Sequence, residues 1–290
     1  NILCSSRKNN LILSAKIDYN PGIKNGMTLN QQKLVEYMAV VKDIQKTSDR
    51  NDLPSIGDIL RLPDIMASGE PEDVDELKKI YRVISVDARG HGKSDKPYDA
   101  ALYDRKIMAS DIISVLDRED IEKAHYMGYS MGGSIGFGLA EAFPQRFHSL
   151  IIGGMHPYPL ADLELEPGVK ALDLMLESLE HGMDVYVGGI EPAPDERELT
   201  HLLSNDQEAI IAATIALRDR PDISEVLPTM TMPCLVYCGD QDGLYPGTEE
   251  CVKHMPNVTW VSLPGLDHGD VMERSDVLLP HVLDFLANIQ

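Results

Sequence analysis

The chain has 290 residues, of which 43% are hydrophobic, and its formal net charge is −21 at pH 7. This length and composition are typical of a globular protein with one large core and room for an insertion. The strong negative charge argues against nucleic acids and anionic membrane surfaces as partners, and no apolar run is long enough to span a membrane.

Residues 1–62 form an atypical N-terminal segment, because their nine Lys and Arg outnumber six Asp and Glu. A strand is predicted within residues 10–19. The Thr28–Gln31 stretch is typical of a capping box, and the apolar residues after it recur at helical spacing. A second helix is predicted over Leu53–Leu60. We therefore expect a partly helical segment ahead of a domain spanning residues 63–290.

The two predicted helices and the positive charge of residues 1–62 are faintly similar to a winged-helix DNA-binding unit. No basic recognition helix is visible, however, so we favour a divergent segment that packs on the rest of the protein. Nucleic acid is otherwise not an expected partner.

A sharp strand–turn–helix is predicted around Gly128–Gly132. The apolar run Ala124–Met127 precedes it, and the small residues Gly132–Gly136 start a helix. A Gly-x-Ser-x-Gly sequence in this context is typical of a nucleophile elbow, in which Ser130 has a strained backbone and an accessible hydroxyl. Glycines flank the turn because a Cβ at either place would collide with its neighbours.

Helical patterns at residues 169–176, 196–203 and 209–217 fill the stretch that follows. We expect an inserted helical cap over about residues 156–230, which would exclude water and shape an apolar pocket. His156 and Tyr158 open this insertion and are expected to border the pocket.

Two further predicted strands end in candidate partners for Ser130. Residues 233–238 lead into a turn with Asp240 and Asp242, and residues 258–263 lead into a loop with His268. A serine needs a histidine to accept its proton and a carboxylate to orient that histidine. We favour Asp242 over Asp240 because it lies further out, where a side chain can reach back across the sheet.

These motifs, in this order, resemble the α/β-hydrolase fold family over roughly residues 75–290. The strand and turn of Tyr81–Asp95 are similar to the family's Asp-x-Arg-Gly-x-Gly-x-Ser turn, in which Arg89 would pair with a carboxylate. Residues 144–154 resemble the helix end and strand after the elbow, and residues 277–288 the closing helix. The resemblance implies a mostly parallel sheet flanked by helices, with an inserted cap.

The resemblance also implies an oxyanion hole of two backbone N–H groups. Met131 provides one. The family's His-Gly turn, which provides the other, is absent, and Ser68–Glu70 is the nearest candidate. Because losing one donor slows turnover in related chemistry, a degenerate hydrolase that acts as a binding or regulatory protein is a second hypothesis.

We expect a serine hydrolase that cleaves a small apolar carboxylic ester or lactone through Ser130, His268 and Asp242, without cofactor or metal. Carbon–carbon bond hydrolysis, thioester hydrolysis and cofactor-free haloperoxidation use the same triad and stay open. The four cysteines lack metal-ligand spacing and are expected to be free thiols, and no signal peptide is recognisable, so we expect a cytoplasmic protein. The sequence does not predict the oligomeric state.

Overall fold

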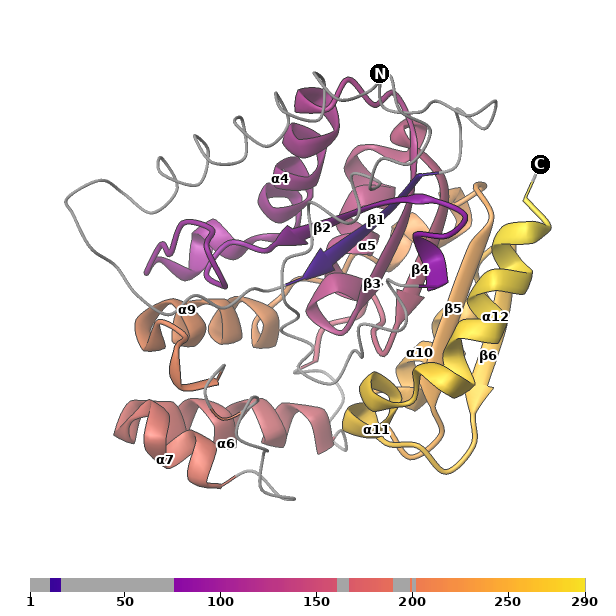
Figure 1. The fold of residues 1–290 in the computed structure, drawn as a ribbon. Helices are drawn as coiled ribbons and strands as arrows, with labels where there is room; N and C mark the ends of the chain where they lie inside the picture. The colour runs from indigo at the N-terminus through magenta and orange to yellow at the C-terminus, as the bar shows by residue number, and fades with distance from the viewer. Residues whose placement is uncertain (1–10, 17–75, 161–166, 190–198, 200–201, 290) are drawn as a thin grey trace.

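The computed structural model describes residues 11–16, 76–160, 167–189, 199 and 202–289 (Figure 1). The helices predicted within residues 28–60 lie outside these ranges, and so do Ser68–Glu70. Both interpretations of the N-terminal segment therefore stay predictions, except for its one described strand.

Six parallel strands form one sheet, in the order β2-β1-β3-β4-β5-β6. Five of them match the strands predicted from the sequence from residue 81 onward. The strands are β1 (Leu11–Lys16), β2 (Arg82–Asp87), β3 (Ala124–Tyr129), β4 (Phe147–Gly153), β5 (Cys234–Gly239) and β6 (Val258–Leu263). The predicted α/β class is confirmed.

Strand β1 lies between β2 and β3 and pairs with both of them. Leu11 is in register with Arg82, and Ile12 is in register with Val83 on one side and His125 on the other. The strand predicted within residues 10–19 therefore exists. It joins the sheet beside the strand that leads to Ser130, although it comes from the segment that composition sets apart from the domain.

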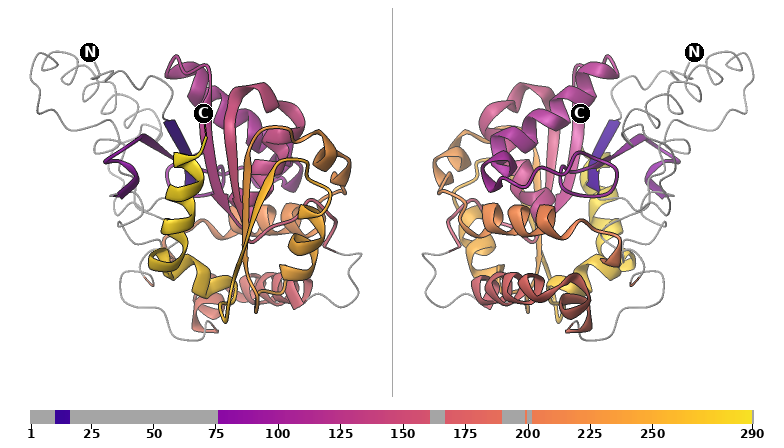
Figure 2. Two further views of the ribbon diagram at one scale, coloured as in Figure 1. Left: turned by 90° about the vertical axis from the view of Figure 1, so that its right-hand side faces the viewer. Right: turned by 90° about the vertical axis from the view of Figure 1, so that its left-hand side faces the viewer.

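Helices cover both faces of the sheet (Figure 2). On one face, α4 (Arg105–Arg118), α5 (Met131–Ala142) and α10 (Tyr245–Val252) contribute to a core that includes Leu150 and Ile152 of β4. The opposite face buries Ile151 against α11 (His268–Glu273) and α12 (Ser275–Ala287). Successive residues of β4 thus face opposite cores, as the pleat of a strand requires.

The closing helix α12 buries the apolar face that its sequence predicts. Leu278, Val282, Phe285 and Leu286 are all at most 9% exposed. Among the described helices, none has both the length and the apolar character that a membrane span needs.

Further helices lie between β4 and β5 in the sequence: α6 (Pro167–His181), α7 (Met183–Gly188), α9 (Gln207–Arg218) and the 3-10 helix η3 (Ser224–Thr229). Figure 1 shows α6, α7 and α9 across the end of the sheet toward which the strands point. Two of the three predicted helical stretches of the insertion are therefore helical. The third, at residues 196–203, lies mostly outside the described residues.

The turn after β2 is held by side chains, as its sequence predicts. Arg89 donates from Nε and Nη2 to the two carboxylate oxygens of Asp111, at 2.7 and 2.8 Å. Gly90 has a φ of +83°, and a Cβ there would lie 2.6 Å from the hydroxyl oxygen of Tyr103. Arg89 therefore has a structural contact that joins this turn to α4.

Candidate active site

The elbow joins β3 to α5 through Ser130. Ser130 has φ 52° and ψ −113°, an unusual conformation for a residue with a Cβ that costs on the order of 1–3 kcal/mol. Its amide donates to the carbonyl of Gly153 at 2.9 Å, which ties the turn to β4. A Cβ on Gly128 would lie 2.4 Å from the carbonyl oxygen of Gly132, so the turn requires glycine at residue 128. The strained turn predicted from the sequence is present.

His268 lies between Ser130 and Asp242. Its Nε2 is 2.9 Å from the hydroxyl oxygen of Ser130, and its Nδ1 is 2.7 Å from a carboxylate oxygen of Asp242. Since an ionised carboxylate only accepts hydrogen bonds, this geometry assigns the ring proton to Nδ1. Nε2 is then left as an acceptor for the hydroxyl proton of Ser130.

His268 is the first residue of α11, and the residue before it fixes the start of that helix. The side chain of Asp267 accepts from the amide of Asp270 at 2.8 Å, and the side chain of Asp270 accepts from the amide of Asp267 at 3.1 Å. This reciprocal capping box satisfies amides that have no partner inside the helix. The cap therefore fixes the backbone from which the imidazole projects.

Of the two candidate acids, Asp242 is the one that contacts His268. It is 5% exposed, and its carboxylate accepts from the amide of Leu244 at 2.9 Å and from the thiol of Cys238 at 3.4 Å. Burial alone would raise the pKa of Asp242, but the hydrogen bonds from His268, Leu244 and Cys238 outweigh it and hold the pKa below its ordinary value. Asp242 is therefore an ionised partner for His268 at neutral pH.

Asp240 has a different contact. Its carboxylate accepts from the amide of Gly265 at 2.8 Å and from the side-chain amide of Gln241 at 2.9 Å. These bonds join the turn after β5 to the loop after β6. Asp240 therefore supports the loop that carries His268.

Met131 is the first residue of α5, directly after Ser130. Its N–H precedes the helix's own hydrogen bonds and lies at the positive end of the helix dipole. The sheet position beside β3 on the side of β2 is occupied by β1. The role of Ser68–Glu70 as the second donor stays a prediction.

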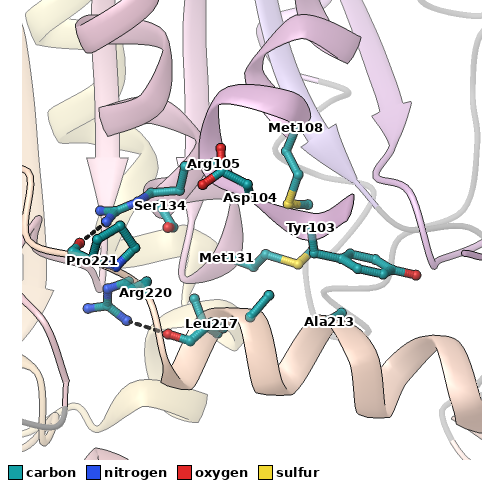
Figure 3. Close-up of a pocket in the computed structure, with 11 residues that line it drawn as sticks. Tyr103, Asp104, Arg105, Met108, Met131, Ser134, Ala213, Leu217, Arg220 and Pro221 are labelled. Carbon is teal, nitrogen blue, oxygen red and sulfur yellow. Dashed lines mark hydrogen bonds between the residues drawn. The ribbon is translucent and has the colours of Figure 1, made fainter. Parts of the chain in front are cut away.

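A small cavity of about 30 Å³ lies between the start of α5, the start of α4 and the end of α9 (Figure 3). Its volume is enough for one or two water molecules. Its apolar lining includes Met108, Met131 and Leu217. Neither His156 nor Tyr158, which were expected to border a pocket, lines this cavity. His156 is completely buried, and a Cβ on Gly247 of α10 would lie 2.4 Å from its ring.

Two buried guanidinium groups lie at the edge of this cavity (Figure 3). Arg105 of α4 is 6% exposed and donates to the carbonyls of Pro157 and Pro221. Arg220, 4% exposed, donates to the carbonyls of His156 and Leu217, each at 3.3 Å. Together they join the chain that leaves β4 to the chain that returns toward β5. The sequence has no signal for this role, since each arginine reads as an ordinary surface charge.

Within the described ranges, no group of three or more His, Cys, Asp or Glu side chains is arranged to hold a metal ion. The cysteines at residues 234, 238 and 251 are buried free thiols.

Comparison with known proteins places similarity in the part of the chain that contains the elbow. The family model for the alpha/beta hydrolase fold matches residues 69–212. A 2-hydroxy-6-oxononadienedioate/2-hydroxy-6-oxononatrienedioate hydrolase of Cupriavidus pinatubonensis is 28% identical over 225 residues, which cover 72% of this chain and 77% of that protein. A 3-oxoadipate enol-lactonase of Acinetobacter baylyi is 40% identical over 76 residues, or 26% of this chain and 27% of that protein.

Solved structures have the same fold. An esterase from Exiguobacterium antarcticum superposes with a TM-score of 0.66 at 19% identity, covering 97% of this chain and 93% of the esterase. The elbow, the strand order and these matches agree, and the chain therefore belongs to the α/β-hydrolase fold family and is a hydrolase.

Proposed function

We propose that this protein is a serine hydrolase that cleaves a small carboxylic ester or lactone through an acyl-enzyme. The observation that carries the proposal is the chain of hydrogen bonds from Ser130 through His268 to Asp242. In this arrangement Ser130 is the nucleophile, His268 the general base and then acid, and Asp242 the group that orients His268.

In the first step, the hydroxyl oxygen of Ser130 forms a bond to the acyl carbon while its proton moves to Nε2 of His268. The carbonyl oxygen becomes an oxyanion, and the N–H of Met131 donates to it. Asp242 stabilises the imidazolium that forms, because its carboxylate already accepts from Nδ1. The oxyanion then re-forms the carbonyl, the carbon–oxygen bond to the leaving group breaks, and His268 gives that oxygen its proton.

In the second step, water replaces the leaving group. His268 takes a proton from the water as its oxygen bonds to the acyl carbon, and it returns that proton to the oxygen of Ser130 as the acyl-enzyme bond breaks. The products are a carboxylic acid and the alcohol, which stay joined in one molecule if the substrate is a lactone. Free enzyme is restored without a cofactor.

The apolar lining near Met131 and the helices across the strand ends support a small apolar substrate. We propose that α6, α7 and α9 form a cap that covers the triad and shapes an apolar pocket over it. The chain is similar to an esterase and to an enol-lactonase, and these names describe the ester and lactone substrates proposed here. The buried free thiols favour a reducing compartment, and we propose the cytoplasm.

Hydrolysis of a carbon–carbon bond is a second candidate, because the oxononadienedioate hydrolase relative aligns over most of its length. The same triad performs both reactions on this fold. Parallel assays with p-nitrophenyl acetate and with pentane-2,4-dione, a β-diketone, distinguish them. Turnover of the diketone above that of the ester would favour the second candidate.

Turnover of p-nitrophenyl acetate by the intact chain and by Ser130→Ala tests the proposal. We expect at least a thousandfold loss of kcat in the variant, since the triad acts as a unit. Ser114→Ala is the control, because the Ser114 hydroxyl bonds only along its own helix, to the carbonyl of Ser110. Equal rates for intact protein and Ser130→Ala would overturn the proposal and favour a binding or regulatory protein without this activity.

A further inference from the structure

Three rings lie one against the next beside Ser130. Tyr237 of β5 stacks on Tyr129 of β3, with ring centroids 5.8 Å apart and an interplanar angle of 23°. The ring of His268 also packs against Tyr129, with ring centroids 5.0 Å apart and an interplanar angle of 40°. Tyr129 is 8% exposed and Tyr237 is 1% exposed. The imidazole of His268 therefore has a buried aromatic support.

Two glycines at the end of β4 provide the space that the rings of Tyr129 and Tyr237 occupy. A Cβ on Gly153 would lie 2.1 Å from the Tyr237 ring, and a Cβ on Gly154 would lie 2.6 Å from the Tyr129 ring. Gly154 also has a φ of +53°, which favours glycine. The Gly-Gly pair at the end of β4 is thus required by the aromatic stack.

The hydroxyl of Tyr129 makes a second contact with His268. It donates to the backbone carbonyl of His268 at 2.9 Å, while its distance to Nδ1 is 3.5 Å. A hydroxyl has one proton, so the shorter contact, to the carbonyl, is the hydrogen bond. Burial raises the pKa of Tyr129 well above its ordinary value, and the hydroxyl stays protonated as a donor.

His268 needs this support because of where it lies. Its side chain is 36% exposed, and it begins a six-residue helix after an irregular loop. Asp242 contacts the ring at Nδ1 alone, and the reaction depends on the opposite ring atom, Nε2, staying in line with Ser130. The Tyr129 hydroxyl holds the backbone carbonyl of His268, and the Tyr129 ring packs against the imidazole. Both contacts limit movement of the imidazole, and a small misplacement of reacting groups can slow a reaction about a hundredfold.

We propose that Tyr129 is a positioning residue, whose hydroxyl holds the backbone of His268 so that Nε2 faces Ser130. The inference rests on the proposed serine hydrolase function. It assigns a role to the residue before the nucleophile, through its contact with His268 and not with the substrate.

The test compares kcat and KM for p-nitrophenyl acetate in the intact chain, Tyr129→Phe and Tyr129→Leu. Tyr129→Phe keeps the ring and removes the hydroxyl, and we expect kcat to fall about tenfold with KM unchanged. Tyr129→Leu removes both contacts, and we expect a fall of about a hundredfold. A Tyr129→Phe variant with kcat of the intact chain, or with a change in KM alone, would overturn the inference.

Ser149→Ala is the control. Ser149 is completely buried in β4, and its hydroxyl oxygen lies 2.8 Å from Nδ1 of His125 in β3, so this variant loses a buried hydrogen bond that involves neither the elbow nor His268. We expect its kcat to match that of the intact chain. An equal fall in Ser149→Ala and Tyr129→Phe would assign the effect to general loosening of β3 and contradict a specific role.

Ser130→Ala separates this inference from the proposed function. If Ser130→Ala abolishes turnover while Tyr129→Phe leaves it unchanged, the inference fails and the proposed function stands. If Ser130→Ala keeps full turnover, the proposed function fails, and the inference fails with it. Urea unfolding of Tyr129→Phe confirms that the variant is folded when its kcat is measured.

Discussion

The carboxylate of Asp242 and the imidazole of His268 are joined by a 2.7 Å hydrogen bond, although each residue follows a different strand of the sheet. On the proposed mechanism this bond fixes the tautomer of His268 and stabilises its protonated form. Asp240 is two residues away and bonds to Gly265 instead. The pair of aspartates therefore provides a variant and a matched control in one turn.

We expect Asp242→Asn to lower kcat about 10⁴-fold, because an amide donor at this place favours the wrong tautomer of His268. Asp240→Asn should change kcat less than about threefold, since its carboxylate supports only the loop. Steady-state hydrolysis of p-nitrophenyl acetate by both variants measures the difference. A larger loss in Asp240→Asn than in Asp242→Asn would contradict the assignment of the acid.

A buried histidine away from the site should make stability depend on pH. His125 of β3 is 5% exposed, and its Nδ1 lies 2.8 Å from the hydroxyl oxygen of Ser149. Burial, with a smaller contribution from the neighbouring His148, lowers the pKa of His125 to about 4. The folded protein therefore keeps His125 neutral where the unfolded chain, with an ordinary pKa of about 6.5, already binds a proton.

The sign of the pH dependence of stability follows from this difference in bound protons between the folded and unfolded states. The stabilisation is complete above about pH 6.5 and is lost as the pH falls toward 4, because the unfolded chain binds the additional proton. Between pH 7 and pH 5 His125 should lower the free energy of unfolding by about 2 kcal/mol. Urea unfolding at both pH values measures the change in the intact chain and in His125→Gln. The same change in both would show that other groups cause it.

Gly128 and Gly188 should respond oppositely to alanine. A Cβ on Gly128 would meet the carbonyl oxygen of Gly132 at 2.4 Å, whereas a Cβ on Gly188 meets nothing within 4 Å. We expect Gly128→Ala to lose at least about 3 kcal/mol of folding free energy, as strained or overpacked core positions do. Gly188→Ala, at the end of α7, should gain up to about 1 kcal/mol. Urea midpoints of both variants test the prediction, and equal midpoints would contradict it.

Arg105 should stabilise the junction between the sheet and the inserted helices. Its guanidinium donates to the carbonyls of Pro157 and Pro221, so Arg105→Met would leave both carbonyls without that donor. We expect a loss of about 2–4 kcal/mol in the free energy of unfolding, because removing a donor from buried acceptors costs their desolvation. Lys106→Met is the control, since Lys106 is exposed and pairs with Glu141 at the surface. Equal urea midpoints for the two variants would contradict the role of Arg105.

Much of the fold follows from local sequence patterns. The strands from residue 81 onward are short apolar runs bounded by turn residues, and α12 has an apolar face at helical spacing, so each is recognisable without its neighbours. Parallel strands also bring their carboxyl ends to one edge of a sheet. The sequence therefore predicts that Ser130, Asp242 and His268 lie together, because each follows the end of a strand.

Other features of the fold and the site depend on contacts between residues that are distant in the sequence. The place of β1 beside β3 depends on hydrogen bonds between residues more than a hundred positions apart, and the local pattern predicts only that a strand exists. The sequence favours Asp242 over Asp240 by its place in the turn, but only the positions of His268 and Gly265 show which partner each carboxylate contacts. The ring of Tyr129, the Gly153–Gly154 pair and the buried Arg105 likewise acquire their roles from partners elsewhere in the chain. Spacing along the chain identifies the reactive groups, but packing between elements decides which atoms meet and what holds them there.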